Sequence, residues 1–199
     1  MHLESFLTVT LWLLSYLIGS VSTAVLVCRL FGWPDPRDTG SNNPGTTNVL
    51  RVASKTAAAL TLLGDVLKGV IPVYLALILH SSPTAIGLCG FFAVLGHLYP
   101  LYFDFKGGKG VATALGVVTL LSWPSGLTII SIWLVIIALT RVASIASLTS
   151  WTAAPFVIYW MAPEYLGPML ILATFIIYRH YSNIIGLIKG NERDFKSSH

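Results

Sequence analysis

The sequence predicts an all-α, polytopic membrane protein with seven transmembrane helices, and three observations carry this prediction. Of the 199 residues, 55% are hydrophobic and only 10% are charged, whereas soluble domains carry about a quarter charged residues. Apolar runs near the length that a bilayer requires, about 20 residues, recur between short polar connections. The lysines and arginines gather in every second connection. At this length we expect a single domain over residues 1–199.

The apolar runs define the predicted spans, at about residues 5–28, 56–80, 84–103, 109–123, 125–141, 145–162 and 165–180. The fourth span is short. Its end is placed near Trp123, Pro124 and Ser125, where a proline and flanking polarity indicate a bend. One long kinked span over residues 109–141 is the alternative, and it would leave six spans.

Charge placement favours seven spans over six. One side of the membrane then receives eleven of the 12 lysines and arginines, and the twelfth, Lys68, lies inside the second span. The positive-inside rule makes the charged side cytoplasmic, so the N-terminus lies outside and the C-terminus in the cytoplasm. The same bias explains the formal net charge of +4, and we therefore expect no nucleic-acid partner.

The segment GSNNPGTTNVLR gathers hydrogen-bonding groups in a cytoplasmic connection of an otherwise apolar chain. Its glycines and proline permit tight turns. Side chains such as Ser41, Asn43 and Asn48 offer hydrogen bonds to an anion, and Arg51 adds a positive charge. A solvated loop with Arg51 as a topological anchor is the alternative interpretation.

The segment GHLYPLYFDFKGGKGVAT holds a glycine–lysine turn directly before a predicted helix. Gly107, Gly108 and Gly110 allow the backbone to approach a ligand closely. Amides that precede a helix face an anion together with the positive end of the helix dipole. Lys106 and Lys109 add charge, and the spacing differs from that of a P-loop. We expect a phosphate or phosphate ester to bind here.

Two further cytoplasmic segments carry polar side chains at helical spacing. Ser144 and Ser147 in RVASIAS are three residues apart, and so are His180 and Asn183 in RHYSNIIGLIKGNE. Each pair can therefore point in one direction from a helix. Glu192, among basic residues, is interpreted as a structural ion-pair partner.

A pair of charges lies within the second predicted span. Asp65 and Lys68 are three residues apart in LLGDVLKGV, and each intramembrane charge costs about 2.5–3.5 kcal/mol on insertion scales. We expect the two to neutralise each other. A role in substrate binding is the alternative.

The sequence lacks the motifs of several enzyme classes. It contains no nucleophile elbow, no H-E-x-x-H, no H-x-x-x-x-D pair and no clustered metal ligands. What remains is a cationic, hydrogen-bonding basin at the inner edge of a helix bundle, which suits one anionic and one lipid-like substrate. A transporter or channel for an organic anion is the alternative, and it would require polar groups that continue to the outer face.

In these motifs and their order, the chain resembles the bacterial acyl-phosphate:glycerol-3-phosphate acyltransferases. The resemblance implies a multi-pass enzyme of the bacterial cell membrane, with seven spans and a cytoplasmic active site. It implies transfer of a fatty acyl group from acyl-phosphate to the 1-hydroxyl of sn-glycerol 3-phosphate, which yields lysophosphatidate and phosphate. We expect the lipid bilayer as partner, no cofactor, no metal and a monomer.

The resemblance also assigns residues. It implies that Ser41, Arg51, His180 and Asn183 act in catalysis and that Glu192 is structural, as we expect for Asp65 and Lys68. The predicted substrate-binding residues are Asn43, Asn48, Lys106, Gly107, Gly108, Lys109, Gly110 and Ser144.

The assigned site differs from the family at one position, and it leaves two candidates for the proton acceptor. Thr46 stands where the family commonly has alanine, and we expect this difference to be tolerated. Either His180 or the substrate's own phosphate would accept the proton of the attacking hydroxyl.

Overall fold

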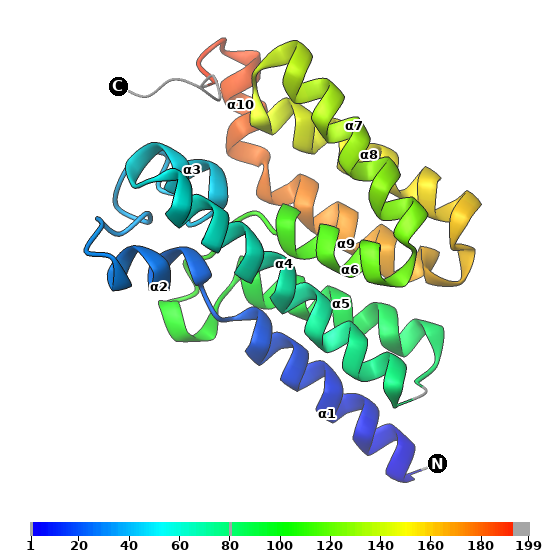
Figure 1. The fold of residues 1–199 in the computed structure, drawn as a ribbon. Helices are drawn as coiled ribbons and strands as arrows, with labels where there is room; N and C mark the ends of the chain where they lie inside the picture. Colours follow the sequence, from blue (N-terminus) through cyan, green and yellow to red (C-terminus); the bar gives the residue numbers. More distant parts are fainter. Residues whose placement is uncertain (1, 80, 193–199) are drawn as a thin grey trace.

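The computed structural model describes residues 2–79 and 81–192, which form a bundle of helices joined by short loops (Figure 1). Two short 3-10 turns, η1 (Leu101–Phe103) and η2 (Pro163–Tyr165), interrupt the connections. The helices are α1 (His2–Gly19), α2 (Thr23–Leu30), α3 (Thr46–Val52), α4 (Lys55–Ile78), α5 (Pro83–Leu98), α6 (Val111–Leu121), α7 (Trp123–Thr140), α8 (Ala143–Met161), α9 (Leu166–Arg179) and α10 (Tyr181–Ile188).

Helix α5 lies at the centre of the bundle, where it packs against α1, α4, α6 and α9. Val94 and Leu98 of α5 are completely buried, as are Val117 of α6 and Ile176 of α9, and all four belong to one hydrophobic core. The core therefore forms around α5, while α7 and α8 pack against each other at one side.

Glycines allow the central helices to approach one another closely. A side chain at Gly96 of α5 would collide with the backbone of α1 at Tyr16, and one at Gly19 would collide with the backbone of α5. In the same way, a side chain at Gly69 of α4 would collide with the backbone of α6, and one at Gly116 of α6 would collide with the backbone of α4. Small residues at such crossings are typical of helix pairs in membranes.

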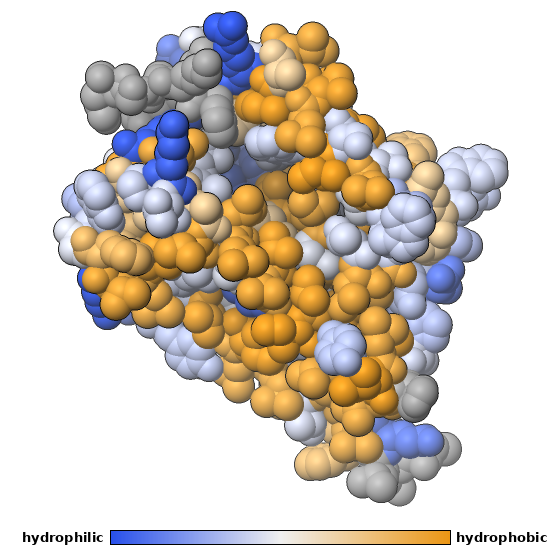
Figure 2. Space-filling view, in the orientation of Figure 1, coloured by the Kyte–Doolittle hydropathy of each residue, from blue (hydrophilic) through white to orange (hydrophobic). Residues whose placement is uncertain are grey.

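Hydrophobic side chains cover most of the face of the bundle shown in Figure 2, and hydrophilic ones gather at the end that carries α3 and α10. Leu13 of α1, Leu63 of α4 and Leu139 of α7 are all more than half exposed. An apolar surface of this extent requires lipid contact.

Four helical segments among the described residues are long and apolar enough to cross a membrane: Glu4–Leu30, Lys55–Ile78, Pro83–Phe103 and Trp123–Thr140. The bent pair formed by α9, with its preceding turn, and α10 would make a fifth. Helix α6 is apolar but has only 11 residues. The chain is therefore an all-helical, polytopic membrane protein with four or five candidate spans.

The structure differs from the predicted segments in two places. The predicted span 5–28 is not one continuous helix, because α1 ends at Gly19 and α2 begins only at Thr23. The polar segment 40–51, which was predicted to be a connection with tight turns, contains the short helix α3. In contrast, the predicted bend near Pro124 is confirmed, since Ser122 is extended and separates α6 from α7.

The predicted pairing of Asp65 and Lys68 is confirmed by an ion pair of 2.8 Å between Oδ1 and Nζ. Lys68 Nζ also donates a hydrogen bond of 2.9 Å to the carbonyl oxygen of Val21, in the break between α1 and α2. A cation is favourable beside the carbonyl groups that follow a helix C-terminus. Nδ1 of His97 lies 3.6 Å from Asp65 Oδ1. The buried charges therefore connect α4 to α5 and to the end of α1.

The crossing of α1 and α5 generates a stability prediction. An added methyl group at Gly96 would meet the Tyr16 carbonyl oxygen and the Ser20 nitrogen, which are backbone atoms that cannot move aside cheaply. We expect Gly96→Ala to lower the free energy of unfolding by about 1–3 kcal/mol, measured by thermal unfolding in detergent.

The matched control is Gly167→Ala, because a methyl group there meets nothing within 4 Å. Equal unfolding temperatures for the two variants would contradict close packing of α1 on α5.

Candidate active site

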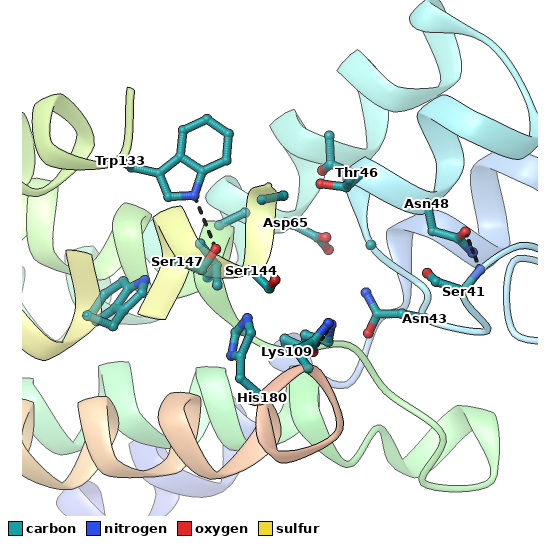
Figure 3. A pocket seen from close by; sticks show the side chains of 18 of the residues that line it. Ser41, Asn43, Thr46, Asn48, Asp65, Lys109, Trp133, Ser144, Ser147 and His180 are labelled. Atoms are coloured by element: carbon teal, nitrogen blue, oxygen red, sulfur yellow. Dashed lines mark hydrogen bonds between the residues drawn. The ribbon is translucent and has the colours of Figure 1, made fainter. Parts of the chain in front are cut away.

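A cavity of about 780 Å³ lies between the loop that carries α3, helices α4, α6, α7 and α8, and the C-terminal segment (Figure 3). One part of its wall is polar and the other is apolar. The predicted site residues that line it are Ser41, Asn43, Asn48, Arg51, Asp65, Lys109, Gly110, Ser144, His180, Asn183 and Glu192. Segments far apart in the sequence therefore meet at one cavity.

Asn48 organises the first loop from its place at the start of α3. Its side chain is almost fully buried, and its Oδ1 accepts a hydrogen bond of 2.8 Å from the backbone N–H of Ser41. Its amide nitrogen donates to the carbonyl oxygens of Pro36 and Thr39. Gly40, with φ of +64°, leaves room for this amide. Asn48 borders the cavity, but these bonds hold the loop in shape.

Arg37 ties the first loop to the segment that precedes the glycine–lysine turn. Its guanidinium binds the Asp35 carboxylate, with 2.7 Å between Nη2 and Oδ2, and Nη1 donates to the carbonyl oxygen of Phe103 at 3.3 Å. The hydrogen bonds from Arg37 hold the pKa of Asp35 below its ordinary value. The two polar loops are therefore fixed relative to each other.

Arg179 holds the glycine–lysine turn from the end of α9. Its Nη2 donates to the carbonyl oxygens of Gly107 at 2.9 Å and Gly108 at 3.1 Å, and its guanidinium lies 5.2 Å from the ring centroid of Tyr99. On the other side, the Gly108 N–H donates to the carbonyl oxygen of His97 at 3.1 Å. The turn is clamped between α9 and α5.

This clamp corrects the prediction for the two glycines. The N–H of Gly108 was expected to face an anion, but it is already bonded to His97. A side chain at Gly107 would collide with the α5 backbone, and one at Gly108 would collide with the His97 ring. Lys106 is exposed, and neither it nor the two glycines line the cavity. The glycines are therefore required for packing against α5.

A chain of hydrogen bonds crosses the polar end of the cavity. Lys109 Nζ donates to Asn183 Oδ1 at 2.6 Å, and Asn183 Nδ2 donates to Glu192 Oε1 at 2.6 Å. Ser144 Oγ donates to the same carboxylate oxygen at 2.9 Å. Glu192 was predicted to be a structural ion-pair partner, but these two hydrogen bonds come from neutral groups, and they join α8 to α10.

Lys109 is a largely buried amine beside the start of α6. Burial lowers its pKa to about 8, and the nearby positive charges of Arg179 and Arg51 act in the same direction, while Glu192 opposes them. The amine is therefore charged at neutral pH but close to its titration point. Arg51, on the last turn of α3, lines the same cavity, so two cationic side chains border it.

His180 lies between α9 and α10, and its ring projects into the cavity (Figure 3). Nδ1 lies 2.8 Å from the carbonyl oxygen of Ile176. Because a carbonyl oxygen only accepts hydrogen bonds, Nδ1 carries a proton, and a neutral ring keeps a lone pair on Nε2. This arrangement can accept a proton from a bound hydroxyl group.

Apolar side chains form the rest of the wall. Leu115 of α6, Ile129 and Trp133 of α7, and Trp151 of α8 line the cavity. The indole N–H of Trp133 donates to Ser147 Oγ at 3.1 Å, which fixes the ring against α8 (Figure 3). The cavity can therefore hold an anionic head and an apolar chain together.

Sequence reasoning missed three of these contributors. Arg179 and Arg37 were counted only as cytoplasmic charges, although Arg179 begins a quoted motif and Arg37 lies just before another. Trp133 sits in an apolar run without any polar signal. Across residues 2–79 and 81–192, no group of three or more histidine, cysteine or carboxylate side chains could hold a metal ion.

Comparison with known proteins gives consistent matches over nearly the whole chain. The profile of the family described as "Glycerol-3-phosphate acyltransferase" matches residues 9–190. The glycerol-3-phosphate acyltransferase of Idiomarina loihiensis is 47% identical over 190 residues, which cover 96% of this chain and 97% of the relative. That of Colwellia psychrerythraea is 47% identical over 186 residues, with 94% and 95% covered.

Two crystal structures of PlsY (YgiH), an integral membrane glycerol 3-phosphate acyltransferase, are similar to this fold. The glycerol 3-phosphate form has a TM-score of 0.89 and 36% sequence identity, and the match covers 96% of each chain. The lysophosphatidic acid form has a TM-score of 0.87 and 36% identity, with 94% of each chain covered.

The clamp on the glycine–lysine turn generates a prediction about local stability. In Arg179→Lys, a single ammonium replaces the planar fork that reaches two carbonyl groups and stacks on Tyr99. Hydrogen bonds from charged groups contribute about 1.5–3 kcal/mol, so we expect amide hydrogen exchange in residues 106–110 to accelerate by roughly tenfold or more. Mass spectrometry of exchanged peptides measures this.

The matched control is Arg29→Lys, which changes an exposed arginine at the end of α2. Identical exchange of the turn in both variants would mean that Arg179 does not hold it.

Proposed function

Because the chain belongs to the glycerol-3-phosphate acyltransferase family, we propose that it transfers a fatty acyl group from acyl-phosphate to the 1-hydroxyl of sn-glycerol 3-phosphate. The products are 1-acyl-sn-glycerol 3-phosphate (lysophosphatidate) and inorganic phosphate. One observation carries the proposal: a single cavity joins a cationic, hydrogen-bonding end to an apolar wall. The glycerol 3-phosphate and lysophosphatidic acid forms of the similar PlsY structures support this acceptor and this product.

The polar end of the cavity binds the phosphate groups of the substrates. Lys109 and Arg51 supply positive charge, so that the phosphate groups of donor and acceptor can lie close together without strong repulsion. Ser41 and Asn43, which line the cavity beside them, offer hydrogen bonds to the phosphoryl or carbonyl oxygens. Asn183 holds the Lys109 amine in place.

The transfer step exchanges one bond to the acyl carbon for another. The acceptor's 1-hydroxyl oxygen bonds to the acyl carbon, and the bond from that carbon to the phosphate oxygen breaks, with its electron pair leaving on phosphate. The hydroxyl proton passes to Nε2 of His180 or to a phosphate oxygen of the substrate. Since phosphate is a good leaving group, positioning and charge neutralisation supply most of the rate enhancement.

We also propose that the enzyme is a single-domain monomer that crosses the bacterial cell membrane seven times, with the N-terminus outside and the active site in the cytoplasm. In Figure 1 the loop with α3, the α5–α6 connection and α10 lie at one end of the bundle. The cations of these segments support a cytoplasmic location. Arg193 and Lys196, which contribute to this bias, lie outside the described residues. Cysteine labelling that placed positions 43 and 109 on opposite sides of the membrane would refute this topology.

The activity is tested with purified protein, palmitoyl phosphate and labelled glycerol 3-phosphate. We expect labelled lysophosphatidate and free phosphate in equal amounts. Parallel reactions with palmitoyl-CoA and palmitoyl-acyl carrier protein should give no product, and transfer from either of these donors instead of acyl-phosphate would contradict the proposed reaction. A transporter of organic anions would form no lysophosphatidate from any donor.

The titration of Lys109 generates a prediction about pH dependence. Its pKa of about 8 in the free protein means that the charged form, which attracts phosphate, predominates below pH 8 and is lost above it. We expect the KM for glycerol 3-phosphate to rise by up to about tenfold per pH unit above 8. The KM for glycerol 3-phosphate is measured by steady-state kinetics from about pH 6.5 to about pH 9.5.

Lys109→Arg should flatten the rise, because a guanidinium stays protonated throughout that range. Lys189→Arg, an exposed substitution at the end of α10, should keep the wild-type profile. An unaltered profile in Lys109→Arg would assign the titration to another group.

A further inference from the structure

Asp65 places a carboxylate in the wall of the cavity, and the proposed reaction does not use it. Its side chain, on α4, is only 3% exposed. It lines the cavity nevertheless, and Figure 3 shows its carboxyl group directed inward. Ionisable side chains within membrane proteins are costly, and they commonly mark the path of a substrate. A buried carboxylate at a cavity is therefore a candidate substrate contact.

The ion pair with Lys68 occupies only one oxygen of this carboxylate. Lys68 Nζ lies 2.8 Å from Oδ1 of Asp65, and His97 Nδ1 lies 3.6 Å from the same oxygen. Within residues 2–79 and 81–192, no hydrogen bond reaches Oδ2. An ionised carboxylate has acceptor sites on both oxygens and no donor. Oδ2 is therefore available to a hydrogen-bond donor in the cavity.

Asp65 lies deeper in the bundle than the two cations of the cavity. Arg51 precedes α4 and Lys109 precedes α6, whereas Asp65 lies about 15 Å along α4 from its first residue. Thr113, on the first turn of α6, has its Oγ1 3.3 Å from His97 Nδ1, and that nitrogen contacts Asp65. The carboxylate is therefore level with the first turn of α6. A small molecule whose anionic group lies at Lys109 can extend toward it.

We propose that Oδ2 of Asp65 accepts a hydrogen bond from the 2-hydroxyl of the acceptor, so that Asp65 selects a polyol phosphate and sets its direction in the cavity. The inference rests on the proposed function, and it adds to it a residue that selects the acceptor. The phosphate group lies at Lys109 and Arg51, and the carbon chain extends from there toward α4.

Charge favours this direction of binding. A hydroxyl group donates a charge-assisted hydrogen bond to a carboxylate, whereas a phosphate beside Asp65 would be repelled. The cation at Lys109 attracts the phosphate to the opposite end. Glu192, the other carboxylate of the described lining, already accepts hydrogen bonds from Asn183 and Ser144. Asp65 is therefore the carboxylate with an oxygen left for the acceptor.

The kinetic test compares two acceptors, sn-glycerol 3-phosphate and 3-hydroxypropyl phosphate, which keeps the phosphate and the terminal hydroxyl but lacks the 2-hydroxyl. We expect the wild type to prefer glycerol 3-phosphate by about tenfold or more in kcat/KM, because the analogue leaves a buried acceptor unpaired. In the double variant Asp65→Leu with Lys68→Met, apolar side chains replace both charges, and the preference should fall below about threefold. The ratio does not depend on the folded fraction, because one preparation serves both acceptors.

The matched control is Lys68→Met alone, which breaks the same ion pair and keeps the carboxyl group. A carboxyl that takes up a proton in this variant still offers an acceptor oxygen, so the preference of the wild type should remain. An equal loss of preference in the control and the double variant, or an undiminished preference in the double variant, would overturn the inference.

A binding measurement without acyl-phosphate tests recognition apart from the reaction. A ligand raises the unfolding temperature according to its affinity. Glycerol 3-phosphate should therefore stabilise the wild type more than 3-hydroxypropyl phosphate at equal concentration, and equal stabilisation by both would overturn the inference. A wild type that forms no lysophosphatidate would refute the proposed function, and the two unfolding temperatures would still decide whether the 2-hydroxyl is recognised.

Discussion

The organisation of the cavity depends on one constraint, the need to keep a charged amine in a largely buried position. Lys109 satisfies it through Asn183, which donates in turn to Glu192, and the Glu192 carboxylate also accepts a hydrogen bond from Ser144. Removing any partner would leave a polar group buried without compensation, which is costly. This constraint joins the turn before α6, the helix α10 and the start of α8. The remaining loop contacts, from Arg179 and Asn48, hold the backbone on either side of this chain.

A second buried charge system lies deeper in the bundle. Asp65 borders the cavity and pairs with Lys68, whose amine also reaches the carbonyl oxygen of Val21. The wall of the cavity is thereby connected to the break between α1 and α2. Breaking a buried pair leaves an uncompensated charge, which is far more harmful than replacing both partners by apolar groups. The α1–α2 break and the α4 wall therefore depend on the same ion pair.

The sequence predicted the helical class, most helix positions and the pairing of Asp65 with Lys68, because hydropathy and i, i+3 spacing are local properties. It did not predict the break after Gly19 or the helix α3, which depend on contacts with distant segments. Asn48 and Gly108 show the same limit within the site. The amide of Asn48 indicates hydrogen bonding, and the missing side chain of Gly108 indicates a close approach. Only the fold reveals that the partner in both cases is the protein's own backbone.

The shortness of α6 affects where the two substrates can meet. Eleven residues extend about 16 Å at 1.5 Å per residue, roughly half of a hydrocarbon layer about 30 Å thick. If the far end of α6 reaches the opposite interface, its N-terminal end stops well below the head groups. The polar end of the cavity, at Lys109 just before α6, would then lie at the level of the fatty chains. Two molecules of unlike solubility would share one depth, and neither would have to leave its own solvent.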